Sequence, residues 1–495
     1  MSRRWLLVIF LLCLAMRLFF ALQTPYFSSD GAYYVERQVS HILETGFPIY
    51  YDELSYGGRW HVVLPVYYYL LAFFGLFLPI GFVLKIVPNV FASCLVFVVY
   101  LVVARLTKNN PLALFTGAVS AILPVFVSRT VNHASVYAFA VPLLFLCLYF
   151  FMEVSSKKSA LPFLFFFFIL AFTHTIAFVF CLGLLLYLLL VKLEGLKNAR
   201  SELEVTLFCF SFVLWLYSVL FKKLFLSYGV AVVWQNVPRE ILSNYFREVT
   251  ISGALNQIGL VPLMAGLYIV YRYLFYYKNR EMLLLVGFAF AALALLWLKF
   301  IPFGLGLMIL GVMLLLLFSQ FMKSFFAYVK KTRVPSWAAF AALILLFIVT
   351  SLVPTIFYSD REIRMGFEEK DISAMQYLRD HTIKGETVAS TLREGNLVAA
   401  VAERPNVMDT NFLLAPDVAR RLADLERIFT SESEVEVVGL LNKYDVHYIV
   451  FSTYAKIRYT RASLSFADDA NCFQLIYEDK DYQVYKVKCK LEKLL

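Results

Sequence analysis

The sequence predicts a polytopic α-helical membrane protein of about eleven transmembrane helices, with a small α/β domain at its C-terminal end. Hydrophobic residues make up 61% of its 495 residues and charged residues only 16%, against about 45–50% and about 25% in a soluble protein. Long apolar runs recur as far as residue 358. Beyond it charges are dense, and no run reaches the length of about 20 residues that a spanning helix needs.

The apolar runs before residue 359 are the predicted spans. They cover residues 5–22, 80–106, 112–127, 136–152, 161–172, 176–191, 203–221, 258–275, 282–298, 303–322 and 337–357. Two stretches allow alternatives. Residues 161–191 form either one long helix or two short ones with a hinge at His174, and residues 64–78 form either a span or a helix on the outer surface.

The distribution of basic residues decides both alternatives. With a hinge at His174 and residues 64–78 not crossing, lysines and arginines gather in alternate connections, on the same side as Arg3 and Arg4. Cytoplasmic loops carry such an excess. We therefore predict a multi-pass protein of the plasma membrane with a cytoplasmic N-terminus and an extracytoplasmic tail. The same rule explains the net charge of +10, so no nucleic-acid partner is expected.

Two domains are expected. Residues 1–358 form the transmembrane domain, with a first outer loop at 23–79, and residues 359–495 form a soluble α/β domain. In that domain the apolar spacing predicts helices over 371–381, 416–429 and 435–444. Strands are predicted over 387–390 and 446–451, followed by a hairpin of 473–477 with 482–487. A two-residue hairpin loop places Cys472 opposite Cys489 within disulfide reach, whereas a one-residue slip separates them.

The loop after the first span carries the first candidate chemistry. At helical spacing Asp30, Tyr34, Arg37 and His41 share one face of a helix that Asp30 opens. A carboxylate just outside the membrane, with donors one and two turns away, is suited to a reaction site. The alternative is that Asp30 only caps the helix. Spacing alone does not separate the two.

The loop sequence SSDGAYYVERQVSHILETGFPIYYDELSYGGR resembles the first outer loop of the GT-C superfamily, membrane glycosyltransferases that use polyprenol-phosphate sugar donors. The stretch Ser128-Arg129-Thr130-Val131-Asn132-His133 is similar to the one before the second acidic motif of oligosaccharyltransferase catalytic subunits. Leu298-Lys299-Phe300 is similar to that family's donor-phosphate contact. The layout also resembles protein mannosyltransferases and aminoarabinose transferases.

Two departures refine the resemblance. Asn132-His133 stands where the second acidic motif belongs, and the tail lacks the Trp-Trp-Asp-Tyr-Gly signature of oligosaccharyltransferases. Both favour the branch that transfers a single sugar without metal or cofactor. The resemblance then implies an inverting transfer from a polyprenyl-phosphate-linked sugar donor to a glycan, lipid or protein acceptor at the outer face of the bilayer. The alternatives are an oligosaccharyltransferase-like glycan transferase and a transporter or flippase for a lipid-linked sugar.

The resemblance also implies roles for individual residues. Asp30 is expected to be the general base that takes the proton of the acceptor hydroxyl. The donor phosphate is expected to contact Lys299, Arg59, His133 and Arg129. The substrate-binding residues are expected to be Tyr34, Arg37 and His174. Each of these residues also has a purely structural alternative. Lys299 would anchor the chain at the lipid headgroups, and Arg129 would fix the third span to the first loop. The histidines would pack against neighbours or lie at helix ends.

Overall fold

The computed structural model describes residues 2–154, 160–197, 199–246, 250–479 and 482–490, and the chain divides into two compact units. The helical unit comprises Met1–Thr24, Leu64–Lys222 and Asn244–Arg364. The α/β unit comprises Pro25–Val63, Lys223–Ser243 and Met365–Leu495. The α/β unit therefore holds more than the tail, because most of the first outer loop and a second insertion pack with it.

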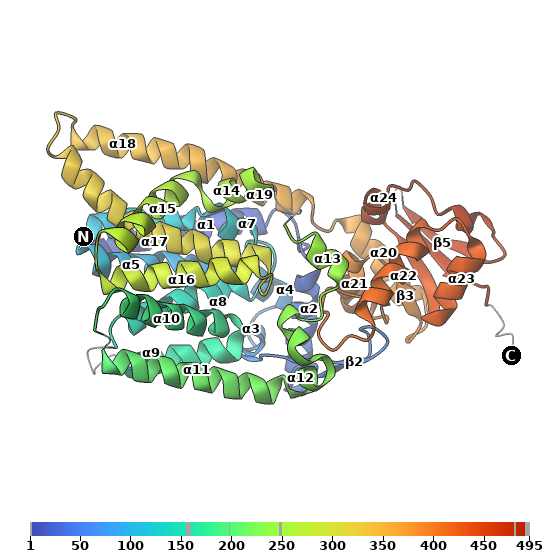
Figure 1. The fold of residues 1–495 in the computed structure, drawn as a ribbon. Coiled ribbons are helices and arrows are strands. Elements are labelled where there is room, and N and C mark those ends of the chain that lie inside the picture. Colours follow the sequence, from blue (N-terminus) through green and yellow to red (C-terminus); the bar gives the residue numbers. More distant parts are fainter. Residues whose placement is uncertain (1, 155–159, 198, 247–249, 480–481, 491–495) are drawn as a thin grey trace. The chain divides into compact units, whose positions relative to one another are not determined.

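The helical unit is a bundle whose helices lie alongside one another (Figure 1). Its elements are α1 (Ser2–Ala21), α3 (Val66–Gly75), α4 (Ile80–Ser93), α5 (Leu95–Thr107), α6 (Asn110–Ala121), α7 (Pro124–Ser128), α8 (Tyr137–Phe151), α9 (Ala160–Thr173), α10 (Ile176–Leu193), α11 (Arg200–Leu220), α14 (Ile251–Ile258), α15 (Leu260–Phe275), α16 (Arg280–Trp297), α17 (Phe303–Val329), α18 (Ser336–Phe347), η2 (Ile348–Leu352) and α19 (Val353–Arg364). A continuous apolar core joins α5, α8, α10, α16 and α17.

The predicted membrane class is confirmed, and each of the eleven predicted runs is helical over most of its length. Within the described residues, seven helices are long and apolar enough to cross a membrane, or eight if the pair α14–α15, bent by 86°, is one span. The other predicted runs are shorter helices. Pro124 explains one of them, because a proline at the first helical position of α7 separates it from α6.

The hinge alternative at His174 is confirmed. Helix α9 ends at Thr173 and α10 begins at Ile176. Helix α3 has 10 residues, half of what a span needs, in keeping with a stretch that does not cross. Which side of the membrane each end faces stays a prediction.

The α/β unit combines a four-stranded mixed sheet with surrounding helices (Figure 1). Its elements are α2 (Asp30–Thr45), β1 (Tyr51–Asp52), β2 (Arg59–Trp60), α12 (Lys222–Tyr228), η1 (Gly229–Trp234), α13 (Arg239–Ser243), α20 (Glu369–His381), β3 (Thr387–Ala389), η3 (Leu392–Glu394), α21 (Gly395–Leu397), η4 (Val398–Ala402), α22 (Val418–Thr430), α23 (Glu434–Lys443), β4 (Val446–Phe451), α24 (Thr453–Tyr459), η5 (Ser465–Asp468), β5 (Phe473–Asp479) and β6 (Tyr482–Val487).

The sheet has the strand order β3-β4-β6-β5. Strands β3 and β4 are parallel, so the chain between them crosses over through α22 and α23, whose apolar faces pack on the sheet. The predicted tail elements are confirmed with one correction. The helix predicted from residue 416 begins at Val418, because Asp417 takes the left-handed conformation with φ 46° and cannot join it.

The terminal hairpin carries a disulfide between Cys472 and Cys489. Near its turn the strands pair as the two-residue loop predicts, with Asp479 opposite Tyr482. An irregularity between Leu475 and Tyr477 then shifts the register by one residue, and the cysteines still meet. The turn residues Lys480 and Asp481 lie outside the described residues.

Candidate active site

Asp30 is the first residue of α2, and its side chain is buried. The residue at the cap position is Ser29, and the Asp30 carboxylate does not cap its own helix. Instead Oδ2 accepts a hydrogen bond of 2.6 Å from the Asn396 side-chain amide, and Oδ1 accepts one of 2.9 Å from the Leu397 backbone N–H. The carboxylate of the first loop is thus held by the first helical turn of a segment 366 residues further along the chain.

The Asp30 site is built by close backbone packing in the tail. Gly395 precedes Asn396, and a Cβ at this position would lie 2.2 Å from the Met408 carbonyl oxygen, so only glycine fits. The Asn396 amide also donates to the Thr410 hydroxyl at 3.2 Å. These contacts fix the amide that faces Asp30.

Asp30 is held by neutral donors only, and this decides its protonation. Burial raises the pKa of Asp30 to about 8, although the hydrogen bonds from Asn396 and Leu397 act to lower it. A carboxylate offers about four lone-pair sites, and the two short bonds together with a longer one of 3.4 Å from the Thr410 hydroxyl leave one of them open. The side chain can therefore take up a proton near neutral pH, as a general base requires.

Tyr34 and Arg37, both predicted substrate ligands, lie one and two turns further along α2. The Arg37 guanidinium binds both carboxylate oxygens of Asp52, at 2.9 and 2.7 Å. The Tyr34 oxygen lies 3.4 Å from His61 Nδ1 and accepts a hydrogen bond of 2.9 Å from Gln38. Arg37 is thus engaged with the β1–β2 hairpin in this structure, and its ion pair with Asp52 joins α2 to the hairpin.

Asp52 has surroundings opposite to those of Asp30. Burial alone would raise the pKa of Asp52, but hydrogen bonds from His61 and Arg37 hold it well below its usual range. Burial in turn lowers the pKa of His61, against the effect of the Asp52 carboxylate. Asp52 is therefore a permanent anion with a structural task.

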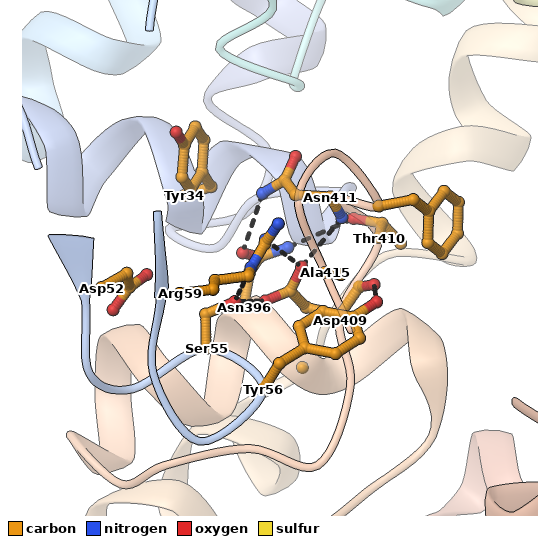
Figure 2. A network of polar contacts seen from close by, with 12 residues as sticks. Tyr34, Asp52, Ser55, Tyr56, Arg59, Asn396, Asp409, Thr410, Asn411 and Ala415 are labelled. Carbon is orange, nitrogen blue, oxygen red and sulfur yellow. Dashed lines mark hydrogen bonds and ion pairs between the residues drawn. The ribbon is translucent and has the colours of Figure 1, made fainter. Parts of the chain in front are cut away.

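Arg59, a predicted phosphate ligand, is the centre of a buried network that joins the hairpin to the tail (Figure 2). Its Nε donates to Ser55 Oγ at 2.7 Å, its Nη1 to the Leu413 carbonyl oxygen at 2.6 Å, and its Nη2 to Asp409 Oδ1 at 3.2 Å. Tyr56 adds a hydrogen bond to the Asp409 backbone carbonyl oxygen. All three nitrogens of the guanidinium hold protein oxygens, so this geometry uses Arg59 to position the segment around Asp409.

The other predicted site residues belong to the helical unit. Arg129 and His133 follow α7, and both face Glu362 of α19, at 3.9 and 3.7 Å. The structure thus brings these two predicted phosphate ligands together on one carboxylate. Arg129 is the more open of the two, with a side chain 40% exposed against 13% for His133.

Lys299 follows α16 in the left-handed conformation, and its ammonium lies 5.5 Å from the centre of the Phe246 ring. His174, a predicted substrate ligand, lies at the hinge between α9 and α10. Its Nδ1 accepts the Ile176 backbone N–H at 3.0 Å, and its ring packs on Tyr137. His174 therefore contacts the first residue of α10, whose N-cap position is taken by Thr175.

The structure shows two buried cations in the helical unit that were not among the predicted site residues. The Lys85 ammonium, on α4, donates to the carbonyl oxygens of Ala21 and Thr24, at 3.1 and 3.0 Å, and to the Asn132 side-chain oxygen. The Arg17 guanidinium, on α1, donates to Asn89 at 3.0 Å. A signal was present, because basic residues inside apolar runs are costly and usually have a specific task.

The residues that the resemblance compares with a metal site do not fit a divalent cation. Asn132, in place of the second acidic motif, has its oxygen on the Lys85 ammonium, and a fixed positive charge repels a metal ion. Both oxygens of Asp30 hold hydrogen-bond donors. Among the described residues, one group of three possible ligands lies close together, Glu434, Asp469 and Cys472, and the sulfur of Cys472 is in the disulfide.

Comparisons with known proteins place this fold. No protein-family model matches the chain, and no curated protein matches its sequence. Solved structures do match. The oligosaccharyltransferase AglB of Archaeoglobus fulgidus superposes with a TM-score of 0.66 at 15% identity, over 98% of this chain and 74% of that one.

Two further similar structures come from other transferases. ArnT of Cupriavidus metallidurans, bound to undecaprenyl phosphate, has a TM-score of 0.54 at 11% identity and covers 97% of both chains. The arabinofuranosyltransferase AftD of Mycobacteria has a TM-score of 0.57 at 14% identity, over 99% of this chain and 40% of that one. The predicted resemblance is confirmed at the level of fold: this chain has the GT-C fold of membrane glycosyltransferases.

Proposed function

We propose that this protein is an inverting membrane glycosyltransferase that moves a single sugar from a polyprenyl phosphate to an acceptor hydroxyl without a metal ion. The observation that carries the proposal is Asp30 on a GT-C fold. It directly follows the first span, it is buried among neutral donors, and its pKa of about 8 suits proton transfer near neutral pH. Such an acid placed only for stability would be costly to bury.

The reaction assigned to this site is an in-line displacement. The acceptor oxygen attacks the anomeric carbon while its proton passes to an Asp30 carboxylate oxygen. The bond between the anomeric carbon and the phosphate oxygen breaks, and the electron pair leaves with the lipid phosphate. Attack opposite the leaving group inverts the anomeric configuration, so one base is sufficient and no covalent sugar–enzyme intermediate forms.

The lipid phosphate that leaves is an anion, and fixed cations would stabilise it. We assign this task to Arg129, His133 and Lys299, of which the first two converge on Glu362. The donor class is supported by two of the similar structures. AglB is known in complex with a dolichol-phosphate, and ArnT is bound to undecaprenyl phosphate.

We assign Arg59 and Arg37 to positioning rather than to substrate contact. Each holds a buried carboxylate in the α/β unit, and a contact with phosphate would have to displace these bonds. Tyr34 remains the proposed substrate ligand on α2, since it lies one turn from Asp30 on the same helix.

An oligosaccharyltransferase-like transfer of a whole glycan is the second candidate. One observation favours it, namely the TM-score of 0.66 with AglB against 0.54 with ArnT. The Lys85–Asn132 contact speaks against it, since it places an ammonium where a metal-dependent enzyme would need a ligand. Dependence of the reaction on divalent ions separates the two.

We also propose that the α/β unit lies outside the cytoplasm of the cell that makes the protein. The disulfide between Cys472 and Cys489 supports this side, because such bonds persist in oxidising compartments. Thiol labelling of intact cells tests it. Two free thiols that react only after the membrane is opened would place the tail in the cytoplasm and contradict the proposed direction of transfer.

The function is tested by transfer from a defined donor. Purified protein in lipid nanodiscs is incubated with a panel of polyprenyl-phosphate sugars, and release of free polyprenyl phosphate is followed by mass spectrometry, with the Asp30→Asn variant as control. A donor consumed by the native chain but not by the variant supports the proposal. Equal consumption by both would overturn the role of Asp30. Mass analysis of surface glycans in a deletion strain then identifies the sugar and the acceptor.

A further inference from the structure

The β1–β2 hairpin of the α/β unit has two faces of opposite character. Asp52 pairs with Arg59 across the ladder, and both side chains are buried in the ion pairs described above. Tyr51 pairs with Trp60, and both are about half exposed, at 49% and 50%. Because successive side chains of a strand point to opposite faces, the polar pair fixes the hairpin and leaves the aromatic pair at the surface.

This aromatic pair lines a hollow of about 470 Å³, within the usual range of about 300–1,000 Å³ for small-ligand pockets. The other walls come from distant segments of the same unit: Lys223 and Leu226 of α12, and Leu414 and Pro416 of the tail. The Lys223 ammonium lies 4.0 Å from the centre of the Trp60 ring. The hollow therefore combines exposed rings with the Lys223 ammonium, and the buried Arg59 also lines it.

The walls of the hollow are fixed from behind. Asn236 donates hydrogen bonds to the carbonyl oxygens of Phe412 and Ala415, at 2.8 and 3.1 Å, and so ties the tail segment to the insertion. Gly58 has φ 106°, and a Cβ at this position would lie 2.6 Å from the Tyr51 hydroxyl. Glycine at residue 58 thus permits both the turn and the position of the Tyr51 ring.

We infer that this hollow binds a saccharide unit of the acceptor, stacked on Trp60 and Tyr51, with Lys223 donating to its hydroxyl or carboxylate oxygens. A sugar ring has an apolar C–H face and a polar edge, which match exposed aromatic rings beside a donor. A membrane anchor would instead require a protruding surface, and these side chains line a concave one. The inference rests on the proposed function, because it names the substrate class of that reaction.

Direct binding tests the inference separately from catalysis. The full-length protein in nanodiscs is titrated with cellotetraose, mannotetraose and tetragalacturonic acid, and binding is followed by saturation-transfer NMR. At least one oligosaccharide is expected to bind in the millimolar range. Trp60→Ala should weaken binding by about tenfold, whereas Trp60→Phe, which keeps a ring, should retain most of it. Gly58→Ala should also weaken binding, since it displaces the Tyr51 ring.

Two matched controls come from the chain itself. Tyr50→Ala removes a neighbouring ring that is 46% exposed and does not line the hollow. Lys222→Ala removes the charge beside Lys223. Both variants should bind as the native protein does, and Lys223→Ala should not.

Three results would overturn the inference. One is the absence of saturable binding for all three oligosaccharides, and another is binding that Trp60→Ala leaves unchanged. The third is a Trp60→Ala variant that loses binding of undecaprenyl phosphate instead, which would assign the hollow to the donor lipid. The Asp30→Asn variant should bind oligosaccharide normally, so failure of the catalytic proposal and failure of this one are distinguishable.

Discussion

Two buried carboxylates of the first outer loop, Asp30 and Asp52, lie in surroundings that give them opposite properties. Asp52 binds the Arg37 guanidinium with both oxygens and keeps a depressed pKa. Asp30 receives only neutral donors, the N–H groups of Asn396 and Leu397 and the Thr410 hydroxyl, and burial raises its pKa to about 8. Burial is common to both, and the charge of the partner decides between a structural anion and an acid that can exchange its proton.

The comparison also explains why the two acids lie in one unit. The Arg37–Asp52 pair fixes α2 to the hairpin, and the Arg59–Asp409 pair fixes the hairpin to the tail. Asn396, which holds Asp30, belongs to that same tail. The charged pairs thus fix the segments of the α/β unit, and this allows Asp30 to be held by weaker neutral donors. Variants of Asp52 and of Asp30 test these two roles separately.

The largest effect is expected where a charged pair is broken. Asp52→Asn should destabilise the protein by about 3–5 kcal/mol, because it leaves the Arg37 guanidinium in a buried place without its charge partner. Thermal unfolding of the purified protein measures the loss. Glu53→Gln removes the neighbouring exposed carboxylate and should change stability little. Equal stability of both variants would show that the Arg37–Asp52 pair does not hold the hairpin.

The second effect concerns Asp30 itself. Asp30→Asn keeps the size of the side chain and loses proton acceptance, so transfer should fall by at least about 10²-fold, the usual scale of general-base loss. Folding should survive, since no charged partner is orphaned. Turnover and thermal unfolding are measured together, again with Glu53→Gln as control. A variant that unfolds as far as Asp52→Asn would make Asp30 structural and remove the distinction between the two acids.

Much of this arrangement could be predicted from the sequence, because it depends on local patterns. Apolar runs indicated the helices, and the break at His174 was recognised from charge. A short continuous apolar run indicated β4, and a polar turn between two short strands indicated the terminal hairpin. The Asp30 side chain was singled out as well. Its partners were not, since Asn396 and Leu397 lie more than 360 residues away and carry no local signal.

The β1–β2 hairpin shows the same limit of prediction from sequence. Asp52 and Arg59 each stand in a polar loop, where most charges are solvated, and only the fold shows that they are buried on Arg37 and Asp409. Lys85 is different, because a lysine inside an apolar run is a visible anomaly. The sequence therefore predicts the site residues that carry a local signal. It does not predict the contacts that depend on pairing between distant segments.

A third prediction uses the pKa of Asp30. The transfer rate should rise about tenfold per pH unit below pH 8 and level off above it, because the base must be ionised. The stability of the folded protein should instead decrease as the pH rises. The folded protein keeps the Asp30 proton up to about pH 8, while the unfolded chain loses it near the ordinary pKa of 3.8, so this group lowers stability as pH rises between these values.

The control for this pH dependence is Asp30→Asn. Its unfolding temperature should fall less between pH 5 and pH 8 than that of the native protein, since residue 30 no longer titrates. Asn396→Ala offers a second measurement. It removes a hydrogen bond that lowers the pKa of Asp30, so the rate profile should shift to higher pH. A profile that is flat from pH 6 to pH 9 would contradict the assignment of Asp30 as base.

The smallest expected effect is that of metal removal. Excess EDTA should leave transfer within about twofold of the untreated rate, because the Asp30 oxygens are occupied by N–H groups and the Asn132 oxygen by the Lys85 ammonium. Carboxylate oxygens free of such donors are what a hard divalent cation binds. The measurement is transfer with EDTA, and then with added Mg²⁺ or Mn²⁺. Activity abolished by EDTA and restored by either ion would instead make His133 and Glu362 suspected ligands and favour the oligosaccharyltransferase-like candidate.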